Sequence, residues 1–282
     1  MKITLSAPAK INLTLGITGL RKDGYHLLES VMQALSLSDT LSFEMIPSGI
    51  VLSCNKSHIP TNEKNLCWKA ARKYLDAAGI SGGVKIHLIK CIPDGAGMGG
   101  GSSDAATVLK AMRILYPAEV DLSELAASIG ADVSFFLRGG TQLCSGVGEI
   151  LEPISLPQKK ALFCVVTKPE DGLSTPAIYK LYDETRTSFA SPMSKEDRAR
   201  LESGDMNALF SLLKNDLELP AIISLPEIAK RKEMLLELGA DAAMMTGSGS
   251  AVFGLFQNEE KARICLQCLT EKGLEAYFCT LL

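Results

Sequence analysis

The chain has 282 residues, 46% of them apolar, and carries a formal net charge of −3 with a pI of about 5.7. This length predicts about two domains, and the acidic balance excludes a general electrostatic attraction to nucleic acid. No run of 18 apolar residues occurs, and the N-terminus alternates like a strand, so we expect neither a membrane-spanning helix nor a signal peptide. These features predict a cytoplasmic protein.

The eight cysteines and three histidines carry no metal-binding pattern. Cys265 and Cys268 are a lone pair without the second Cys or His pair that completes a zinc site. Both lie on the expected inner face of a helix over 259–270. We therefore expect buried, reduced thiols and no metal-ligating residues.

The first strong pattern along the chain is a strict alternation over residues 9–17, which predicts a strand. Apolar residues at 11, 13, 15 and 17 share one face, whereas Lys10 and Asn12 share the other. From the residues alone two interpretations stay open. Lys10 and Asn12 either face solvent or line the wall of a binding cleft.

A turn over 20–26 follows and ends in Tyr25 and His26. A tyrosine ring offers a stacking platform for a nucleobase, and an imidazole can hydrogen-bond the edge of a base, but an ordinary surface hairpin explains the same residues. Strands are then expected at 27–37, 41–46 and 50–54, and a helix over 64–78 with Asn65 near its start.

A glycine-rich segment, between a strand at 84–88 and a helix whose apolar spacing begins after Asp104, organises the chain. Glycines let backbone N–H groups approach a ligand, and a helix N-terminus adds unpaired donors and partial positive charge. Together these features predict an anion site, above all for phosphate. The Walker motif is excluded because no Lys-Ser or Lys-Thr follows, and the dinucleotide motif because no acid-terminated strand follows. The segment comprises Pro93, Asp94, Gly95, Ala96, Gly97, Met98, Gly99, Gly100, Gly101, Ser102 and Ser103.

After a helix at 122–129, the lone Asp132 fits the role of a helix cap on local grounds. A change of composition near 152–160 divides the chain into expected domains 1–155 and 156–282. Beyond this boundary the patterns predict strands at 161–167, 240–245, 251–256 and 274–280, and helices at 195–201, 206–213, 226–238 and 259–270.

Three segments resemble the signatures of the GHMP kinases, named for galactose, homoserine, mevalonate and phosphomevalonate kinases. They are Pro8-Ala-Lys-Ile-Asn-Leu-Thr-Leu, Pro93-x-x-x-Gly-Met-Gly-Gly-Gly-Ser-Ser and Thr246-Gly-Ser-Gly-Ser. Two more, Arg21-Lys-Asp-Gly-Tyr-His and Thr175-Pro-Ala-Ile-Tyr, resemble the branch that phosphorylates 4-diphosphocytidyl-2-C-methyl-D-erythritol. The resemblance extends over essentially the whole chain.

This resemblance implies an α+β sandwich of two domains. The N-terminal domain would be ribosomal-protein-S5-like and the C-terminal one ferredoxin-like, with the active site in the cleft between them. The implied reaction transfers phosphate from ATP, with Mg²⁺, to the 2-hydroxyl of the cytidyl substrate in non-mevalonate isoprenoid synthesis. We expect a monomer or weak homodimer with no nucleic-acid or membrane partner.

The resemblance also implies roles for residues at matching positions. Asp132 matches the catalytic base, and Lys10 matches the residue that orients the base and the hydroxyl. The segment Pro93 to Ser103 would bind the triphosphate. Asn65 and Lys90 match adenine contacts, although a helix-start residue and a surface lysine explain them equally well. The substrate-binding residues implied are Asn12, Tyr25, His26, Thr175, Tyr179, Gly247, Ser248 and Gly249.

The chain departs from the family pattern at Ala96, Met98, Asp104 and Ser134. Asp104 stands where Asn is common and places a carboxylate beside the phosphate segment. There it either weakens nucleotide binding or helps to hold Mg²⁺, and the sequence does not decide between the two.

Two other functions fit parts of the sequence. A homoserine or mevalonate type of GHMP kinase has no need of a cytosine site, so Tyr25, His26 and Tyr179 argue against it. A catalytically silent, nucleotide-dependent sensor has no need of both Lys10 and Asp132.

Overall fold

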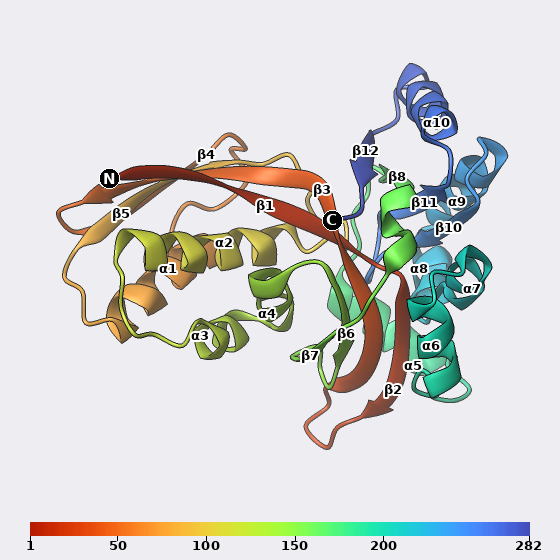
Figure 1. The fold of residues 1–282 in the computed structure, drawn as a ribbon, viewed down its shortest axis with the longest axis horizontal. Coiled ribbons are helices and arrows are strands. Elements are labelled where there is room, and N and C mark those ends of the chain that lie inside the picture. Colours follow the sequence, from red (N-terminus) through yellow and green to blue (C-terminus); the bar gives the residue numbers. More distant parts are fainter. The chain divides into compact units, whose positions relative to one another are not determined.

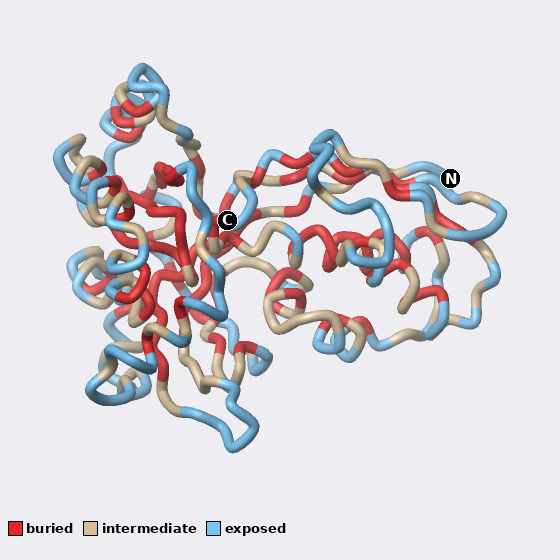
Figure 2. Tube along the Cα trace, turned by 180° about the vertical axis from the view of Figure 1, so that it is seen from behind, coloured by how far each residue is buried: buried red, intermediate tan, exposed pale blue.

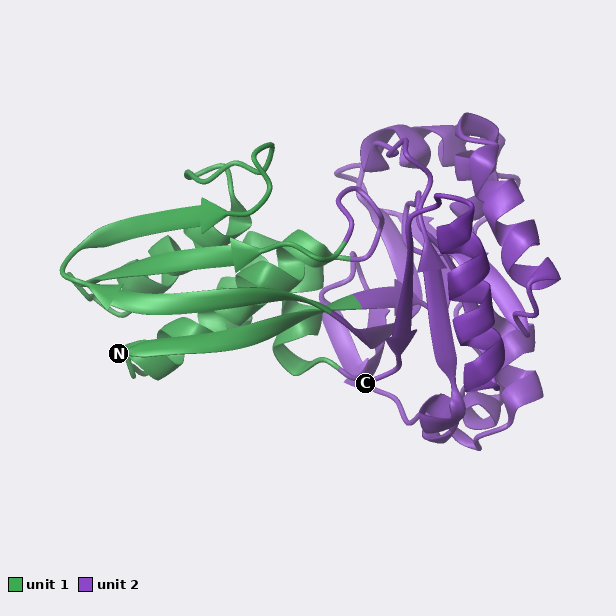
Figure 3. Cartoon of the chain, turned by 90° about the horizontal axis from the view of Figure 1, so that it is seen from above, with its two compact units in different colours: residues 1–9, 38–92, 99–139 green, residues 10–37, 93–98, 140–282 purple.

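A computed structural model describes all of residues 1–282 and divides them into two compact units. Unit 1 contains residues 1–9, 38–92 and 99–139, and unit 2 contains residues 10–37, 93–98 and 140–282 (Figure 3). Strands β1 (Lys2–Asn12) and β3 (His26–Ile46) contribute residues to both units. No helix combines the length and the apolar character needed to cross a bilayer.

Unit 1 is a sheet with helices on one face (Figures 1 and 3). In it β4 (Gly49–Cys54) pairs in parallel with β5 (Gly83–Ile89), β5 pairs antiparallel with β3, and β3 pairs with β1. Residues at 84, 86 and 88 of β5 are buried, whereas Lys85 and His87 are exposed, so only one face of the sheet is packed. The helices of this unit are α1 (Leu66–Ala77), α2 (Gly100–Leu115), α3 (Leu122–Ile129) and α4 (Ala131–Arg138).

Unit 2 contains the other strands. β2 (Thr14–Leu20) pairs antiparallel with β3 and in parallel with β9 (Lys214–Asn215), and β6 (Thr141–Ser145) pairs with β3 and with β7 (Ile150–Pro153). A separate antiparallel sheet has the order β10-β11-β8-β12. Its strands are β8 (Phe163–Thr167), β10 (Ala242–Met245), β11 (Val252–Phe256) and β12 (Ala276–Thr280).

Helices α9 (Glu227–Glu237) and α10 (Glu259–Glu271) contact this second sheet. Burial in unit 2 follows the strands and the inner sides of the helices (Figure 2). Cys265 is buried there as expected, but Cys268 is only half-buried, so the expectation of two core thiols is wrong for Cys268. The other helices of unit 2 are η1 (Pro157–Ala161), α5 (Thr175–Thr185), α6 (Lys195–Glu202), α7 (Met206–Leu212) and α8 (Glu218–Ser224).

Most expected elements occur, but several boundaries are wrong. The strand expected over 9–17 is interrupted at Leu13, where β1 ends and β2 has not yet begun. The two strands expected at 27–37 and 41–46 are one strand, β3, because its polar central residues, including Asp39, take sheet positions. Helix α2 starts at Gly100, before its apolar spacing begins, and α5 and α8 were not predicted.

Candidate active site

Lys10 and Asn12, at the end of β1, are buried, with 4% and 1% of their surface exposed. Lys10 Nζ donates a hydrogen bond to Asn12 Oδ1 at 2.6 Å, and Asn12 Nδ2 donates to Ser30 Oγ at 2.7 Å. The interpretation that places both residues in solvent is therefore wrong. Burying an ammonium group is costly unless it is hydrogen-bonded, and here the amide oxygen of Asn12 supplies a partner.

Two glycine segments of unit 2, Pro93–Met98 and Thr246–Ser250, lie against each other beside Lys10. The backbone N–H of Lys10 donates to Met98 O at 3.1 Å, and that of Asn12 donates to Thr246 Oγ1 at 3.0 Å. A Cβ on Gly247 would lie 2.9 Å from Gly97 O and 3.3 Å from Lys10 Nζ. The predicted residues Lys10, Asn12, Gly97, Met98 and Gly247 are thus brought together.

The remainder of the glycine-rich segment, Gly99 to Ser103, forms the N-cap and first residues of α2 in unit 1. Gly99 occupies the N-cap position with φ +70° and ψ 19°, and no side chain caps the helix. The first N–H groups of a helix have no partner within the helix, and its N-terminus carries partial positive charge. The first turn of α2 therefore offers backbone donors to an anion.

A buried group of charges lies beneath this first turn. Lys90 Nζ donates to Asp104 Oδ2 at 3.0 Å and to Asp39 Oδ2, and the three residues are between 0% and 6% exposed. The interpretation of Lys90 as a surface lysine is therefore wrong. Burial raises the pKa of Asp104 from 3.8 to about 7, which the positive charge of Lys90 opposes and the negative charge of Asp39 reinforces. The Asp104 carboxylate, whose role the sequence left open, binds the Lys90 ammonium.

Asn65 and Asp132 lie at the starts of two helices of unit 1. Asn65 caps α1, because its Oδ1 accepts the N–H of Cys67 at 2.8 Å, and its Nδ2 donates to Pro60 O at 2.7 Å. Asp132 is half-buried in the first turn of α4, where Gly130 is the N-cap residue and no side chain caps the helix. The interpretation of Asn65 as a helix-start residue holds, and the capping interpretation of Asp132 is wrong.

The predicted cytosine residues lie in unit 2 but are not equally placed. The His26 and Tyr179 rings are 4.9 Å apart between centroids, and His26 Nε2 lies 2.9 Å from Asp183 Oδ1. This hydrogen bond is the main cause that lowers the pKa of Asp183. The Tyr25 side chain is instead 65% exposed, with the Arg21 guanidinium 6.0 Å from its ring centroid.

The other predicted substrate residues join α5 to the second glycine segment. Thr175 Oγ1 and Ser248 Oγ are 2.7 Å apart, so the structure brings these two predicted residues together. Gly249 has φ +85°, and a Cβ there would lie 2.8 Å from Met245 Sδ. The turn at 246–250 therefore depends on glycine at position 249.

Sequence reasoning missed two carboxylates that hold predicted residues in place. Asp39 accepts hydrogen bonds from the N–H groups of Cys91 and Ile92 at 2.6 and 2.8 Å in addition to its contact with Lys90. Asp183 holds His26 from one turn beyond Tyr179 on α5. A signal for Asp39 existed, since an acidic residue stands there between two apolar stretches of strand pattern.

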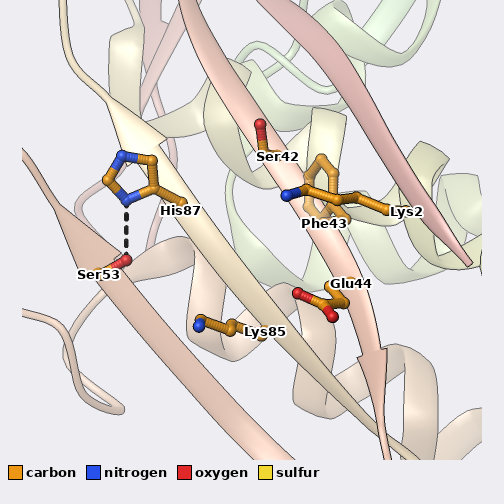
Figure 4. Close-up of a pocket in the computed structure, with 7 residues that line it drawn as sticks. All are labelled: Lys2, Ser42, Phe43, Glu44, Ser53, Lys85 and His87. Carbon is orange, nitrogen blue, oxygen red and sulfur yellow. Dashed lines mark hydrogen bonds between the residues drawn. The ribbon is translucent and has the colours of Figure 1, made fainter.

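A pocket of about 350 Å³ lies on the exposed face of the unit 1 sheet (Figure 4). His87 Nδ1 and Ser53 Oγ, which are 2.9 Å apart, stand at one side of it, and Glu44 and Lys85 stand close together at another. No residue of the predicted site lines this pocket, which consists of Lys2, Ser42, Phe43, Glu44, Ser53, Lys85 and His87.

Comparison with known proteins shows which families and relatives the chain is similar to. The GHMP kinases N terminal domain matches residues 65–140, and the GHMP kinases C terminal domain matches residues 198–274. A 4-diphosphocytidyl-2-C-methyl-D-erythritol kinase of Clostridium botulinum (strain Loch Maree / Type A3) is 39% identical over 274 residues, covering 96% of this chain and 97% of the relative.

Solved structures give a consistent picture. The crystal structure of a 4-(cytidine 5'-diphospho)-2C-methyl-D-erythritol kinase is 40% identical, with a TM-score of 0.85, and 99% of each chain is covered. A homoserine kinase from Cytophaga hutchinsonii has a TM-score of 0.75 at 18% identity, with 99% of this chain and 95% of that chain covered. At this low identity the second likeness concerns the fold alone.

Proposed function

The chain belongs to the GHMP kinases, and we propose that it phosphorylates the 2-hydroxyl of 4-diphosphocytidyl-2-C-methyl-D-erythritol with ATP. The observation that carries this function is identity of about 40% to kinases of that substrate over nearly the whole of both chains. The chain is accordingly an ATP-dependent small-molecule kinase of the non-mevalonate isoprenoid pathway. The likeness to homoserine kinase carries no activity, so that alternative has no observation in its favour.

We propose that the uncapped first turn of α2 and the glycine segment Pro93–Met98 hold the triphosphate. Gly99, with φ +70°, lets the chain enter the helix without a side chain over its first N–H groups. Phosphoryl transfer needs little covalent help from a protein, so catalysis rests on positioning and on stabilising charge. Backbone donors fixed before the substrate arrives serve both needs.

We propose that Mg²⁺ arrives with ATP, since no group of three His, Cys, Asp or Glu side chains is placed to hold a metal ion. Mg²⁺ is commonly held by substrate phosphates, water and only one or two protein oxygens. Ser103 Oγ, which is buried without a hydrogen-bond partner in α2, fits the role of such an oxygen. When bound, Mg²⁺ neutralises charge on the triphosphate.

Asp132 and Lys10 are the proposed catalytic pair. In the proposed reaction Asp132 accepts the proton of the attacking hydroxyl, a role for which its carboxylate is suited because it caps no helix. Lys10 offsets the negative charge that develops as the proton leaves. Asn12 holds the ammonium group of Lys10 at 2.6 Å and fixes its direction.

The cytosine end of the substrate is assigned to His26 and Tyr179, with Tyr25 on the exposed side of the base. His26 Nε2 lies 2.9 Å from Asp183 Oδ1, so the other ring nitrogen, Nδ1, is the one proposed to hydrogen-bond the edge of cytosine. Binding energy from this remote end aligns the reacting hydroxyl. We propose that Thr175 and Ser248 contact the substrate between its two ends.

Three further assignments are proposals as well. Adenine contacts by Asn65 and Lys90 rest on the family match, although both side chains already have hydrogen-bond partners in the structure. The division into domains 1–155 and 156–282 rests on the sequence and agrees in order with the two family matches. A cytoplasmic location fits eight cysteines that are all free thiols.

Phosphorus NMR tests the function directly. The purified protein with Mg-ATP is expected to convert the cytidyl substrate to a product with a new phosphomonoester signal, and to leave homoserine and mevalonate unchanged. Phosphorylation of homoserine or mevalonate at a comparable rate would overturn the proposal. ATP binding without transfer to any of the three would favour the sensor.

Replacing Tyr179 with Ala is expected to weaken binding of the cytidyl substrate about 5- to 150-fold, because stacking on a base contributes roughly 1–3 kcal/mol. Tyr179→Phe keeps the ring and should change little. Titration calorimetry with the cytidyl substrate and with ATP measures both affinities, and Tyr277→Ala on β12 controls for loss of a tyrosine elsewhere. Equal loss of both ligands in Tyr179→Ala would indicate a folding defect, and no loss would indicate a substrate without cytosine.

A further inference from the structure

Asn12 can direct Lys10 only if its own amide is held in one orientation. The amide has an oxygen that accepts hydrogen bonds and an NH2 group that donates them, and a half-turn exchanges the two. The oxygen faces Lys10 Nζ at 2.6 Å. The reversed amide would point its hydrogens at an ammonium group, which has no lone pair to accept them. The group that holds the amide of Asn12 in place therefore also positions Lys10.

Ser30, on β3, supplies this restraint. Its Oγ accepts a hydrogen bond from Asn12 Nδ2 at 2.7 Å and donates its single hydroxyl hydrogen to the carbonyl oxygen of Thr14 at 2.5 Å. Because Thr14 takes that hydrogen, Ser30 Oγ faces Asn12 with lone pairs alone. It can bind the NH2 group of the amide but not the oxygen, since two acceptors would then meet. Ser30 therefore permits only the orientation that turns the oxygen to Lys10.

Thr246 supports the same orientation from the second glycine segment. Its Oγ1 accepts the backbone N–H of Asn12 at 3.0 Å and donates to Asn12 Oδ1 at 3.3 Å. The second distance exceeds the usual O–H···O range of about 2.5–3.0 Å, whereas the bond from Asn12 Nδ2 to Ser30 is short for an N–H···O bond. Ser30 is therefore the stronger of the two restraints on the amide.

The surroundings show that the contribution of the Ser30 hydroxyl is specific. Ser30 and Asn12 are 0% and 1% exposed, so water cannot readily replace a hydrogen bond that is lost there. The chain bends at Leu13, between β1 and β2. This bend is held separately, by Leu13 N donating to Val31 O and by Val31 N donating to Thr14 Oγ1, both at 2.8 Å. Removal of the Ser30 hydroxyl should therefore free the amide of Asn12 and leave the bend in place.

We propose that Ser30 is a positioning residue of the kinase, which orients the amide of Asn12 and through it the ammonium group of Lys10. Without the hydroxyl the amide can turn, and the ammonium group loses its fixed direction. The transition state is then stabilised less, because a charge acts best when it is held in place before the reaction. This inference rests on the proposed function, because it assumes that Lys10 acts in phosphoryl transfer.

Steady-state kinetics of Ser30→Ala tests the proposal. The variant should lower kcat about tenfold, within the range for residues coupled in one hydrogen-bond network, and should keep a KM for ATP close to that of the wild type. Thr141→Val is the matched control. Thr141 is buried on β6, which pairs with β3, and its hydroxyl donates to Gln33 Oε1 at 2.5 Å. Both variants should lose melting temperature, and equal losses of kcat would overturn the specific role of Ser30.

A double-mutant cycle with Asn12→Asp separates orientation from packing. A carboxylate has two equivalent oxygens, so it offers Lys10 an acceptor whichever way it turns. Ser30→Ala should therefore lower kcat much less in the Asn12→Asp background than in the wild type. The same loss in both backgrounds would mean that Ser30 acts by packing, and the proposal would be wrong.

A spectroscopic readout needs no turnover. In protein with isotope-labelled asparagine, the Nδ2 signals of Asn12 are identified by their absence from Asn12→Asp. Hydrogen exchange of these signals with solvent should be about tenfold faster in Ser30→Ala, the effect of losing one hydrogen bond, and unchanged in Thr141→Val. Unchanged exchange in Ser30→Ala would overturn the restraint on the amide. Wild-type protein that transfers no phosphate would instead overturn the proposed function and leave this result standing.

Discussion

Replacing Asp132 with Asn is expected to lower kcat by about 10²- to 10⁴-fold and to leave the protein folded, because the amide keeps the shape of the side chain but cannot accept the proton of the substrate hydroxyl. Asp132 accepts no backbone N–H as a helix cap, so the change should cost little stability. Affinity for ATP should stay close to that of the wild type, since the proposed role concerns the hydroxyl and not the triphosphate.

Steady-state kinetics with the cytidyl substrate measures this loss, and Asp121→Ala is the matched control. Asp121 caps α3, with its Oδ1 accepting the N–H of Ser123 at 2.7 Å, and removal of such a cap costs about 1 kcal/mol of stability. The two variants should show opposite effects, one on kcat and the other on the melting temperature. Wild-type kcat in Asp132→Asn would remove Asp132 from the chemistry.

The sequence predicted which residues share a face better than it predicted whether that face is buried. Alternation placed Lys10 and Asn12 on one face of a strand, and this face is the polar one as predicted. Alternation could not tell whether that face meets solvent, because burial depends on segments more than two hundred residues away. Thr246, which contacts Asn12, belongs to such a segment.

Dependence on distant segments also explains why the sequence predicted neither the hydrogen bonds of Asp39 nor the raised pKa of Asp104. A carboxylate within a strand pattern indicates a break, so the sequence predicted two strands where the structure has one. Asp39 lies at this predicted break and accepts a backbone N–H just before the glycine-rich segment. Lys90, the partner of Asp104, lies fourteen residues earlier in the chain and outside α2, so no local spacing predicts the pair. Glycines were the clearer signal, since their backbone requirements are local.

Replacing Gly97 with Ala is expected to lower kcat/KM about 100-fold, the loss that follows when reacting groups are misplaced by about 1 Å. A Cβ at this position would lie 2.3 Å from the carbonyl oxygen of Thr246, a distance that no side-chain movement can relieve because the obstacle is backbone. The two glycine segments must then separate. Because Thr246 is hydrogen-bonded to Asn12, and Asn12 to Lys10, this separation displaces the Lys10 ammonium group as well.

Gly95→Ala separates this steric effect from backbone strain. Gly95 has φ +61° and Gly97 has φ +72°, so alanine at either position adopts a left-handed conformation, which destabilises the folded protein by roughly 1–2 kcal/mol. A Cβ on Gly95 meets nothing within 4 Å. Both variants should therefore lose stability to backbone strain in thermal unfolding, with a further loss in Gly97→Ala from the clash, but only Gly97→Ala should lose most of its kcat/KM. Equal activity in the two variants would mean that contact between the glycine segments does not position Lys10, and the catalytic role of this network would have to be abandoned.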